Sequence, residues 1–290
     1  MTDTPVGLAE AREQFLNLVA GVRPELHRYC ARLTGSVIEG EDIVQDALAK
    51  AFYALSLLVE VPPLRPWLFR IAHNAALDLL KSHGRKYVEV HAELDELAGF
   101  EDRPDPALVR SALARFLTLP LTQRSAVILK DVLGHSLEET AETMGISRLA
   151  VKAALVRGRR TLLETEPPAQ DLGPVRADLE RYASLFNARD WDGVRALVSA
   201  DCELDLVARS RRRGKQVGLY FTRYDQEPVT LRIASLEGRP TLVAYPAGEG
   251  APPYFILLEF SAGQVTSIRD FRYVPYIAAE AEFELADRSL

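Results

Sequence analysis

Hydrophobic residues recur every three or four positions along 41–55, EDIVQDALAKAFYAL, which is the period of a helix with one buried face. The buried face consists of Ile43, Val44, Ala47, Leu48, Ala51, Phe52 and Leu55. The same spacing leaves Asp42, Gln45, Asp46 and Lys50 facing outward. On its own, such an acidic face is either a solvated surface or a docking surface for another protein.

A second helix is expected over 67–86, WLFRIAHNAALDLLKSHGRK, after prolines at 62, 63 and 66. It carries a polar stripe at helical spacing, made of Arg70, His73, Asn74, Asp78 and Lys81. Trp67 stands at the head of this stripe, and such a combination suits unstacked bases, which stack on aromatic rings and hydrogen-bond at their edges. The alternative is structural, with Trp67 in the core and His73 as an ordinary surface histidine.

Residues 120–163 have the pattern of a helix-turn-helix. Ser136 stands three residues before Glu139, which is a capping box, and the helix that it starts is expected to end at Met144, with Gly145 in the left-handed turn. Ser147 then caps a second helix over 148–163. Its buried side consists of Val151, Ala154, Leu155, Gly158 and Leu162. Its outer side consists of Leu149, Ala153, Val156, Arg157 and Arg160, flanked by Arg148, Lys152 and Arg159.

This last helix holds five basic side chains and no acidic one. Such a helix fits the major groove of DNA, where arginines reach phosphates or guanine edges and aliphatic side chains touch thymine methyl groups. The alternative is a solvated surface helix. The caps, the turn and the single sign of charge agree with one another and favour DNA binding.

In the C-terminal part of the chain, two helices are followed by strands. Helices are expected over 175–188 and 192–198, and strands over 202–207, 229–236, 241–245, 254–260 and 265–273. Helices followed by an antiparallel sheet are an α+β pattern. The basic run ARSRRRGK, 208–215, is expected to be an exposed loop after the first strand.

This C-terminal part offers little for catalysis. It contains no histidine, since the five histidines of the chain are at 27, 73, 83, 91 and 135. Asp205, Glu259 and Asp270 lie on expected strands, where alternation alone does not tell whether they face a pocket or solvent. We therefore expect regulation or ligand sensing rather than turnover, with no catalytic residue and no enzyme activity.

Charge is distributed unevenly along the 290 residues. The whole chain has a net charge of −6, whereas 107–165 holds nine basic and five acidic residues. An acidic protein binds DNA poorly by itself, so a second protein is expected to hold it there. Cys30 and Cys202 are expected to be buried free thiols, and no metal or cofactor pattern is present. The longest apolar run, 254–258, is too short to cross a membrane, so a cytoplasmic protein is expected.

Three segments, in this order and spacing, resemble a known family. EDIVQDALAKAF, then PWLFRIAHNAALDLLKS, then the stretch from LPLTQRSAVILK to VRGRRTL resemble regions 2 and 4 of an extracytoplasmic-function-type sigma factor of bacterial RNA polymerase. The resemblance implies region 2 over 8–83, an acidic linker over 84–106 and region 4 over 107–165, with both regions all-α.

The resemblance also implies roles for individual residues. The EDIVQDA helix of this family docks on the clamp helices of the largest polymerase subunit, which makes Asp42, Gln45 and Asp46 the expected core interface. The next helix and the loop before it open the −10 element and hold flipped bases. That role falls to Trp67, Arg70, His73, Asn74 and Lys81. The −35 element would be read by Arg148, Leu149, Lys152, Arg157 and Arg160.

One departure from the family pattern concerns the −35 helix. Many relatives read VKSRL where this chain has VKAAL at 151–155, so a Ser and an Arg that often serve at the −35 site are missing. Either Arg157 and Arg160 carry more of the contact, or recognition of the −35 element is weaker and depends on DNA shape.

The segment FNARDWDGVRALVSADCELDLV, 186–207, resembles the start of SnoaL-like domains of the NTF2-like fold. That fold is a curved antiparallel sheet wrapped on helices around a conical pocket. In sigma factors with such a domain, the domain is thought to modulate the sigma factor in place of a separate anti-sigma protein. We therefore expect a third domain over 172–290 that contacts the sigma part of the same chain, and whose pocket is a candidate site for a small molecule.

The sequence thus predicts a multidomain protein that binds core RNA polymerase and directs promoter-specific initiation: two all-α domains followed by an α+β domain. Two alternatives stay open. A stand-alone helix-turn-helix regulator with a ligand-sensing NTF2-like domain would bind duplex operator tightly alone, but it leaves EDIVQDA and WLFRIAHN unexplained. The other is an NTF2-like enzyme whose N-terminal half only localises it.

Overall fold

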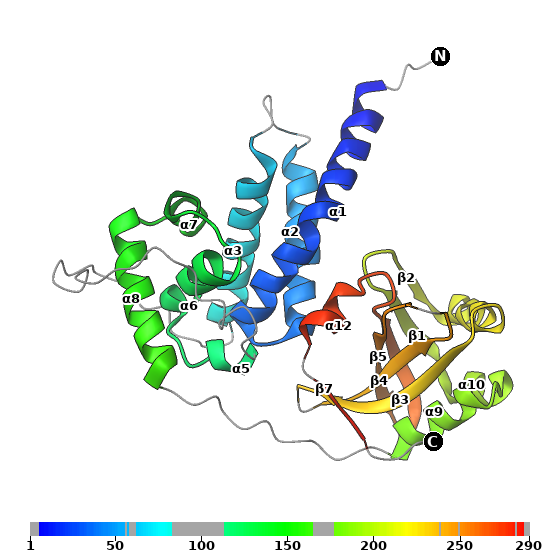
Figure 1. Ribbon diagram of the computed structural model, residues 1–290. Helices are drawn as coiled ribbons and strands as arrows, with labels where there is room; N and C mark the ends of the chain where they lie inside the picture. The colour runs from blue at the N-terminus through cyan, green and yellow to red at the C-terminus, as the bar shows by residue number, and fades with distance from the viewer. Residues whose placement is uncertain are drawn as a thin grey trace. The chain divides into compact units, whose positions relative to one another are not determined.

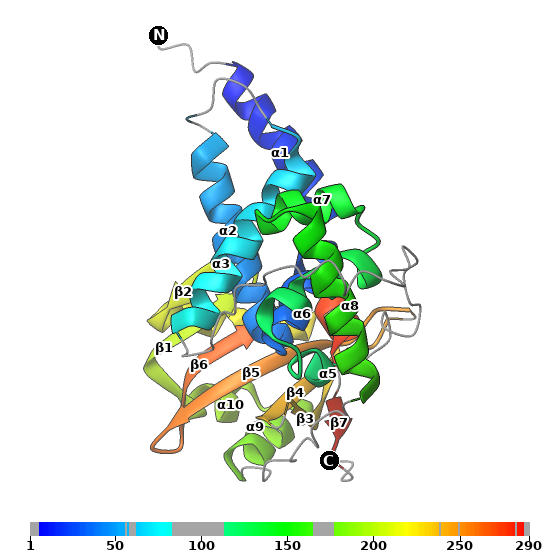
Figure 2. The ribbon, with the colours of Figure 1, turned by 90° about the vertical axis from the view of Figure 1, so that its left-hand side faces the viewer.

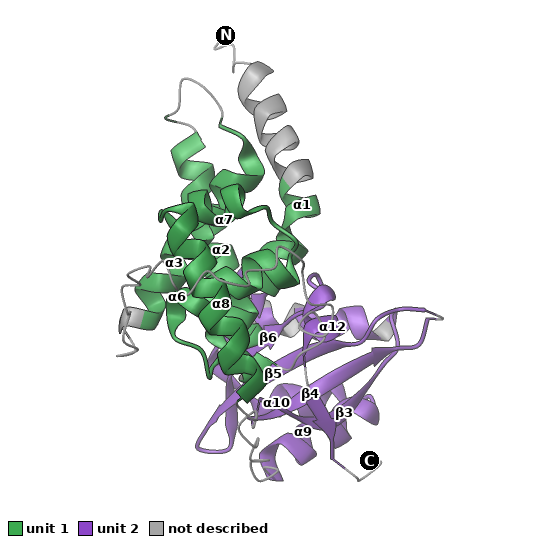
Figure 3. Ribbon diagram, turned by 60° about the vertical axis from the view of Figure 1, so that its left-hand side comes forward, with its two compact units in different colours: residues 1–168 green, residues 169–290 purple. Residues whose placement is uncertain are grey.

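The chain forms two compact units, 1–168 and 169–290 (Figure 3). The computed structural model describes residues 6–55, 57, 62–82, 113–164, 177–237, 239–248, 250–281 and 283–286. The expected acidic linker, 84–106, lies outside these residues. Each unit has its own hydrophobic core, one in a set of helices and one between helices and a sheet (Figure 1).

The first unit is helical throughout its described part. Its elements are α1 (Val6–Thr34), α2 (Val37–Leu55), α3 (Leu64–Ser82), α5 (Leu113–Phe116), α6 (Leu121–Val127), the π-helical turn η2 (Ile128–Val132), α7 (Leu137–Met144) and α8 (Arg148–Glu164). The helices expected over 41–55, 67–86 and 148–163 are present as α2, α3 and α8.

Helices α1 and α2 pack closely because a glycine stands where they meet. A Cβ atom at Gly40 would lie 2.6 Å from the backbone nitrogen of Ala31, so a larger residue would push the helices apart. The inward side of α2 is buried as expected, at Ile43, Val44, Ala47, Leu48 and Ala51. The prediction is wrong at Phe52, which lies at the edge of the apolar arc and is 46 % exposed.

The helix-turn-helix has the caps that the sequence predicts. The hydroxyl of Ser136 accepts from the backbone N–H of Glu139 at 3.1 Å, and the Glu139 carboxylate accepts from the backbone N–H of Ser136 at 2.8 Å. Gly145 ends α7 in the left-handed region, with φ of 66°. Ser147 caps α8 by accepting from the backbone N–H of Ala150 at 3.2 Å. These contacts orient α8 relative to α7.

One hydrophobic core runs through the whole helical unit. It joins residues of α1, α2 and α3 to residues of α6, α7 and α8, so the two predicted helical domains pack together rather than standing apart (Figure 2). On the inner side of α8, Val151, Ala154, Leu155, Gly158 and Leu162 are buried as expected. The separate boundaries of regions 2 and 4 remain a prediction.

The second unit contains helices and a sheet of seven strands. Its elements are α9 (Ala177–Asn187), α10 (Trp191–Leu197), β1 (Val198–Leu206), β2 (Ser210–Arg213), η3 (Gly214–Val217), α11 (Gly218–Phe221), η4 (Thr222–Asp225), β3 (Val229–Leu236), β4 (Arg239–Pro246), β5 (Tyr254–Ser261), β6 (Gln264–Asp270), α12 (Tyr276–Glu280) and β7 (Phe283–Leu285).

The strand order is β2-β1-β6-β5-β4-β3-β7, and every neighbouring pair is antiparallel except β1 and β6. Helices α9 and α10 pack against this curved sheet (Figure 1). Asn187 fastens α9 to β3, because its side-chain amide donates to the carbonyl of Leu231 at 2.9 Å and accepts from its N–H at 2.8 Å. The predicted α+β architecture is confirmed.

Two strands were not expected from the sequence. The basic run was expected to be a loop, but residues 210–213 form β2, in which Arg211 pairs with Asp205 of β1. The loop prediction failed because four arginines and a lysine in eight residues hide the alternation of a short edge strand. The short strand β7 adds to β3 at the other edge, where Glu284 pairs with Ser235.

Candidate protein and nucleic-acid interfaces

The outer side of α2 combines acidic and aromatic side chains. Asp42 and Asp46 are exposed and Gln45 is half-buried, and the Asp46 carboxylate lies 2.7 Å from the Lys50 ammonium. Phe52 and Tyr53 continue the same side at helical spacing and are 46 % and 70 % exposed. We call these residues, Asp42, Gln45, Asp46, Phe52 and Tyr53, the α2 outer face.

The side chain of Gln45 in this face is positioned by buried polar groups. The Gln45 amide donates to the Glu41 carboxylate at 3.5 Å, and that buried carboxylate is paired with Arg23 of α1. The sequence did not single out Phe52 and Tyr53, because the apolar pattern assigned Phe52 to the core. Large exposed aromatic side chains next to charged ones are typical of protein interfaces.

The polar stripe of α3 is exposed only in part. Arg70, Asn74 and Asp78 are exposed, and Trp67 is half-buried against the core. His73 is 2 % exposed, with its Nδ1 2.6 Å from the Tyr29 hydroxyl oxygen. The expectation of an exposed His73 is therefore wrong: the ring belongs to the buried side of α3, where the tyrosine satisfies its nitrogen. The side chain of Lys81 lies outside the described residues.

The predicted −35 residues lie on α8 at different depths. Arg148 and Arg160 are exposed, Lys152 and Arg157 are half-buried, and Leu149 is 40 % exposed. The nearest carboxylate to Arg148 that the structure describes is Glu138, at 3.5 Å, and both side chains are mostly in solvent, where such a pair contributes little.

Two residues assigned to the outer side of α8 have structural positions instead. Ala153 is fully buried, so the outer side is narrower than the sequence predicts. Arg159 holds Asp131 of η2 with two bonds, Nε to Oδ2 at 2.9 Å and Nη2 to Oδ1 at 2.6 Å. Asp131 is fully buried as a side chain, and a two-pronged guanidinium–carboxylate bond is among the stronger polar contacts in proteins. Arg159 therefore fixes α8 onto the rest of the helix-turn-helix.

A polar cluster joins α1 and α3 to the helix-turn-helix. Arg65 donates to the Glu25 carboxylate at 3.1 and 2.5 Å, and its Nη2 lies 2.9 Å from the His135 Nε2. Its Nη1 reaches Glu139 of α7 at 3.4 Å. The His135 ring meets Phe69 edge-on, with centroids 4.7 Å apart. We call Glu25, Arg65, Phe69, His135 and Glu139 the Arg65 cluster.

The electrostatics of the Arg65 cluster depend on Glu25. Burial would raise the pKa of this carboxyl, but hydrogen bonds from His135 and Arg65 outweigh burial and lower its pKa to about 2. Glu25 is therefore ionised at neutral pH and holds Arg65 against the loop that carries His135.

A second contact joins the same two parts of the helical unit. The Arg124 guanidinium of α6 donates to the carbonyl of Leu33 at the end of α1 at 2.7 Å, and to the carbonyl of Leu119 at 2.9 Å. Together with the shared core, Arg124 and the Arg65 cluster hold α1–α3 and α5–α8 in one closed arrangement.

The interior of the second unit contains a buried carboxylate, Asp270, that is surrounded by polar contacts. Asp270 Oδ2 accepts from the hydroxyls of Tyr220 and Tyr224 at 2.8 and 3.1 Å, and it lies 2.6 Å from Arg272 Nη2. Its Oδ1 accepts from the backbone N–H of Arg272 at 2.9 Å. Burial and the nearby carboxylate raise the pKa of both tyrosines well above 10.0, so they stay donors. Of the three strand carboxylates named from the sequence, this one faces inward, and Glu259 is exposed.

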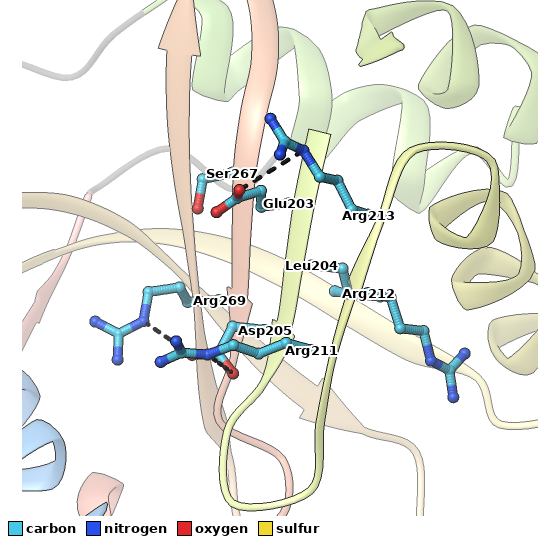
Figure 4. Close-up of a pocket in the computed structure, with 8 residues that line it drawn as sticks. All are labelled: Glu203, Leu204, Asp205, Arg211, Arg212, Arg213, Ser267 and Arg269. Carbon is cyan, nitrogen blue, oxygen red and sulfur yellow. Dashed lines mark ion pairs between the residues drawn. The ribbon is translucent and has the colours of Figure 1, made fainter. Parts of the chain in front are cut away.

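The third carboxylate, Asp205, lies in a charged hollow on strands β1, β2 and β6 (Figure 4). Its oxygens are 3.6 Å from both Arg211 and Arg269, and Glu203 is 3.7 Å from Arg213. These separations are longer than hydrogen bonds, and the carboxylates partly neutralise the arginines. The hollow is therefore a surface of mixed charge and not a concentrated anion site.

Both cysteines are buried free thiols, as the sequence predicts. Burial raises the pKa of Cys202 to about 11 and that of Cys30 further. Among the residues that the structure describes, no group of three or more His, Cys, Asp or Glu side chains has an arrangement that could hold a metal ion. The described helices include none whose length and apolar character would let it cross a membrane.

The chain matches two family descriptions, Sigma-70 region 2 over residues 18–86 and Sigma-70, region 4 over residues 110–162. It is 32 % identical to the ECF RNA polymerase sigma factor SigG of Mycobacterium tuberculosis, over 90 % of this chain and 82 % of that protein. Because the first unit ends at Pro168, a match of this extent must include much of the second unit. The chain belongs to the ECF family of RNA polymerase sigma factors.

Two solved structures show weaker likeness. The crystal structure of the ECF sigma factor SigJ of Mycobacterium tuberculosis is 20 % identical, covers 90 % of this chain and 98 % of that one, and has a TM-score of 0.37. Bal32a, from a soil-derived mobile gene cassette, is 20 % identical over 34 % of this chain and 89 % of its own, with a TM-score of 0.29.

Proposed function

We propose that the α2 outer face binds core RNA polymerase, that α3 holds the opened −10 element through Trp67, Arg70 and Asn74, and that α8 reads the −35 element. The observation that carries this proposal is the presence of all three surfaces, in family order, on one helical unit. Arg148 and Arg160 are exposed on α8, and Asp42 and Asp46 are exposed on α2.

The closed arrangement has to open for this function. The −35 and −10 elements are about 25 base pairs apart, which is about 85 Å at about 3.4 Å per base pair. A compact unit of about 170 residues has a radius of gyration of only about 15 Å. The segment 83–112 between α3 and α5 has a maximum reach of about 100 Å at about 3.3 Å per residue. We infer that α1–α3 and α5–α8 separate on the promoter, which the length of chain between them permits.

The second unit acts in this proposal as a modulator that contacts the sigma part of the same chain, without turning over a substrate. Supporting this, the inward carboxylate Asp270 already accepts hydrogen bonds from two tyrosines and an arginine, so its oxygens are occupied and not available to take a proton from a substrate. The protein would act in the cytoplasm, because core polymerase and promoter DNA are found there.

The test is transcription in vitro with purified core polymerase, comparing the full-length protein with one that ends at Pro168. Start-site-specific transcripts with the full-length protein are expected. A shortened protein that is more active would identify the second unit as an inhibitor, and an inactive one as a positive element. Tight binding to duplex DNA without polymerase, together with no transcript, would instead favour a stand-alone regulator.

A further inference from the structure

The second unit contains a cleft with proline walls. Pro228, Pro246, Pro252 and Pro275 come from separate segments between η4 and α12, and the cleft has a volume of about 660 Å³. Volumes of roughly 300–1,000 Å³ are typical of sites for small organic molecules. Proline fixes its own φ angle, so walls built from it lose little entropy on binding. This cleft, which we call the proline cleft, is therefore formed before any ligand arrives.

Arg272 lines the proline cleft with a guanidinium that is held from behind. Its Nε donates to Asp270 Oδ2 at 2.8 Å, and its Nη2 contacts both the same oxygen and the Tyr224 hydroxyl. The guanidinium carbon lies over the Tyr224 and Tyr254 rings, 4.6 and 5.5 Å from their centroids. These contacts fix the side chain, which is only 8 % exposed.

One nitrogen of the Arg272 guanidinium, Nη1, has no hydrogen-bond acceptor among the described residues, whereas Nε and Nη2 are both engaged. Because Arg272 lines the cleft, Nη1 is the donor available to a molecule bound there. A buried or half-buried guanidinium N–H favours a carboxylate or carbonyl acceptor.

The other charges around the cleft balance one another. Arg223 donates to the Glu227 carboxylate at 2.8 and 2.9 Å, and to the Tyr273 hydroxyl at 3.0 Å. The charge of Arg272 is likewise balanced by the Asp270 carboxylate. A phosphate needs several donors and carries up to two charges, so the nearby Glu227 and Asp270 disfavour it. A monocarboxylate carries one charge and not two, so these carboxylates disfavour it less, and one of its two oxygens can accept from the available donor.

The walls specify the rest of the ligand. Tyr254 and Tyr273 line the cleft together with the four prolines, so most of its surface is apolar and part of it is aromatic. Flat rings pack well on such walls, and burying them there removes apolar area from water.

We propose that the proline cleft binds a small aromatic monocarboxylate, whose carboxylate accepts a hydrogen bond from Arg272 Nη1 and whose ring packs on Tyr254 and the prolines. The proposal goes beyond the sigma factor function and does not depend on it, because binding requires neither polymerase nor DNA. It gives the modulating unit a ligand to which it can respond.

The test uses the full-length protein and the probe 1-naphthoate, titrated by ligand-observed NMR, with 1-naphthalenemethanol as the neutral counterpart. Naphthoate should bind at least about tenfold more tightly than the alcohol, which corresponds to 1.4 kcal/mol of discrimination by Arg272. Inorganic phosphate should not compete. Equal affinity for acid and alcohol, competition by phosphate, or no saturable binding in the millimolar range would overturn the proposal.

Two variants of exposed residues form a matched pair. Ala251→Trp fills the cleft from an exposed wall position and should weaken naphthoate at least tenfold. Ser261→Trp places the same ring on an exposed position at the end of β5, outside the cleft, and should leave binding unchanged. Equal binding to these two variants, each with an unchanged melting temperature, would contradict the assignment.

A third variant tests the donor itself. Arg272→Lys keeps a positive charge beside Asp270, but its three N–H groups lie on one nitrogen and cannot reach both Asp270 and the ligand as the separate nitrogens of the guanidinium do. The preference for acid over alcohol should therefore disappear. A preserved preference in a folded Arg272→Lys protein would refute the role of Nη1. If this variant does not fold, the comparison of acid with alcohol and the two tryptophan variants decide the question.

Discussion

Removing the guanidinium of Arg65 should open the helical unit. Arg65→Met keeps the aliphatic stem against Phe69 but removes the polar contacts that Arg65 makes across the joint, with His135 Nε2 at 2.9 Å and with Glu139 at 3.4 Å. A hydrogen bond to a charged group contributes about 1.5–3 kcal/mol when buried, and a surface ion pair about 0–1 kcal/mol. Arg65 and Glu139 are more than a third exposed, so we discount the sum to about 1–2 kcal/mol.

A change of about 1–2 kcal/mol makes the open arrangement roughly 5- to 30-fold more populated relative to the closed one. If polymerase binds only the open arrangement, the apparent Kd for core polymerase should fall by up to the same factor. The gain stops once the open arrangement predominates.

Two measurements check this. Dyes attached at Leu57→Cys and Leu163→Cys, both highly exposed positions on the two sides of the joint, report opening of the free protein by energy transfer. Fluorescence anisotropy with purified core polymerase reports affinity. Arg65→Met should lower the transfer efficiency and tighten binding.

Arg148→Met is the matched control, because it removes the same charge from an exposed arginine whose ion pair, with Glu138, lies within the helix-turn-helix. It should leave the energy transfer of the free protein unchanged. Identical transfer and identical affinity in Arg65→Met and wild type would refute the inference that the Arg65 cluster keeps the unit closed.

Three further predictions concern other parts of the helical unit. Arg160→Ala should weaken binding of the holoenzyme to a −35 element by about 1–3 kcal/mol without changing the melting temperature. Arg159→Ala should instead lower the melting temperature, because it removes the partner of the buried Asp131 carboxylate. Equal melting temperatures would contradict the different roles of these two arginines. Replacing Tyr53 by Ser should weaken core binding several-fold with unchanged stability, measured by anisotropy, and an unchanged Kd would remove this residue from the interface. Because the pKa of Glu25 is lowered to about 2, its contribution to stability is present above pH 4.5 and is lost as pH falls toward 2. The difference in unfolding free energy between wild type and Glu25→Gln, measured by urea unfolding, should therefore shrink over that range. A constant difference would contradict the lowered pKa.

The features that the sequence predicts well are local ones. The capping box of Ser136 and Glu139, the left-handed Gly145 and the buried side of α8 follow from spacing within one or two helical turns. All five expected strands in the second unit also match strands of the sheet, with ends that differ by at most four residues. Such patterns depend on neighbours along the chain, which a sequence displays directly.

The features that it misses depend on partners far along the chain. Helical spacing cannot tell that His73 turns toward Tyr29, 44 residues earlier, or that Arg159 is needed by the buried Asp131. In the same way, the closed joint depends on Arg65 meeting His135, 70 residues later. The sequence predicts which helix faces form the candidate interfaces. Which residues of each face are exposed and which have structural contacts is known only from the structure.

The central claim is tested most directly by forming the complex with purified core RNA polymerase and reversing the acidic charges of the α2 outer face. The full-length protein should form a one-to-one complex, seen by native mass spectrometry, and Asp42→Lys with Asp46→Lys should abolish it in a protein that is still folded, as shown by its circular dichroism. A doubly substituted protein that assembles as well as wild type would contradict the interface, and a wild-type protein that forms no complex would contradict the whole account.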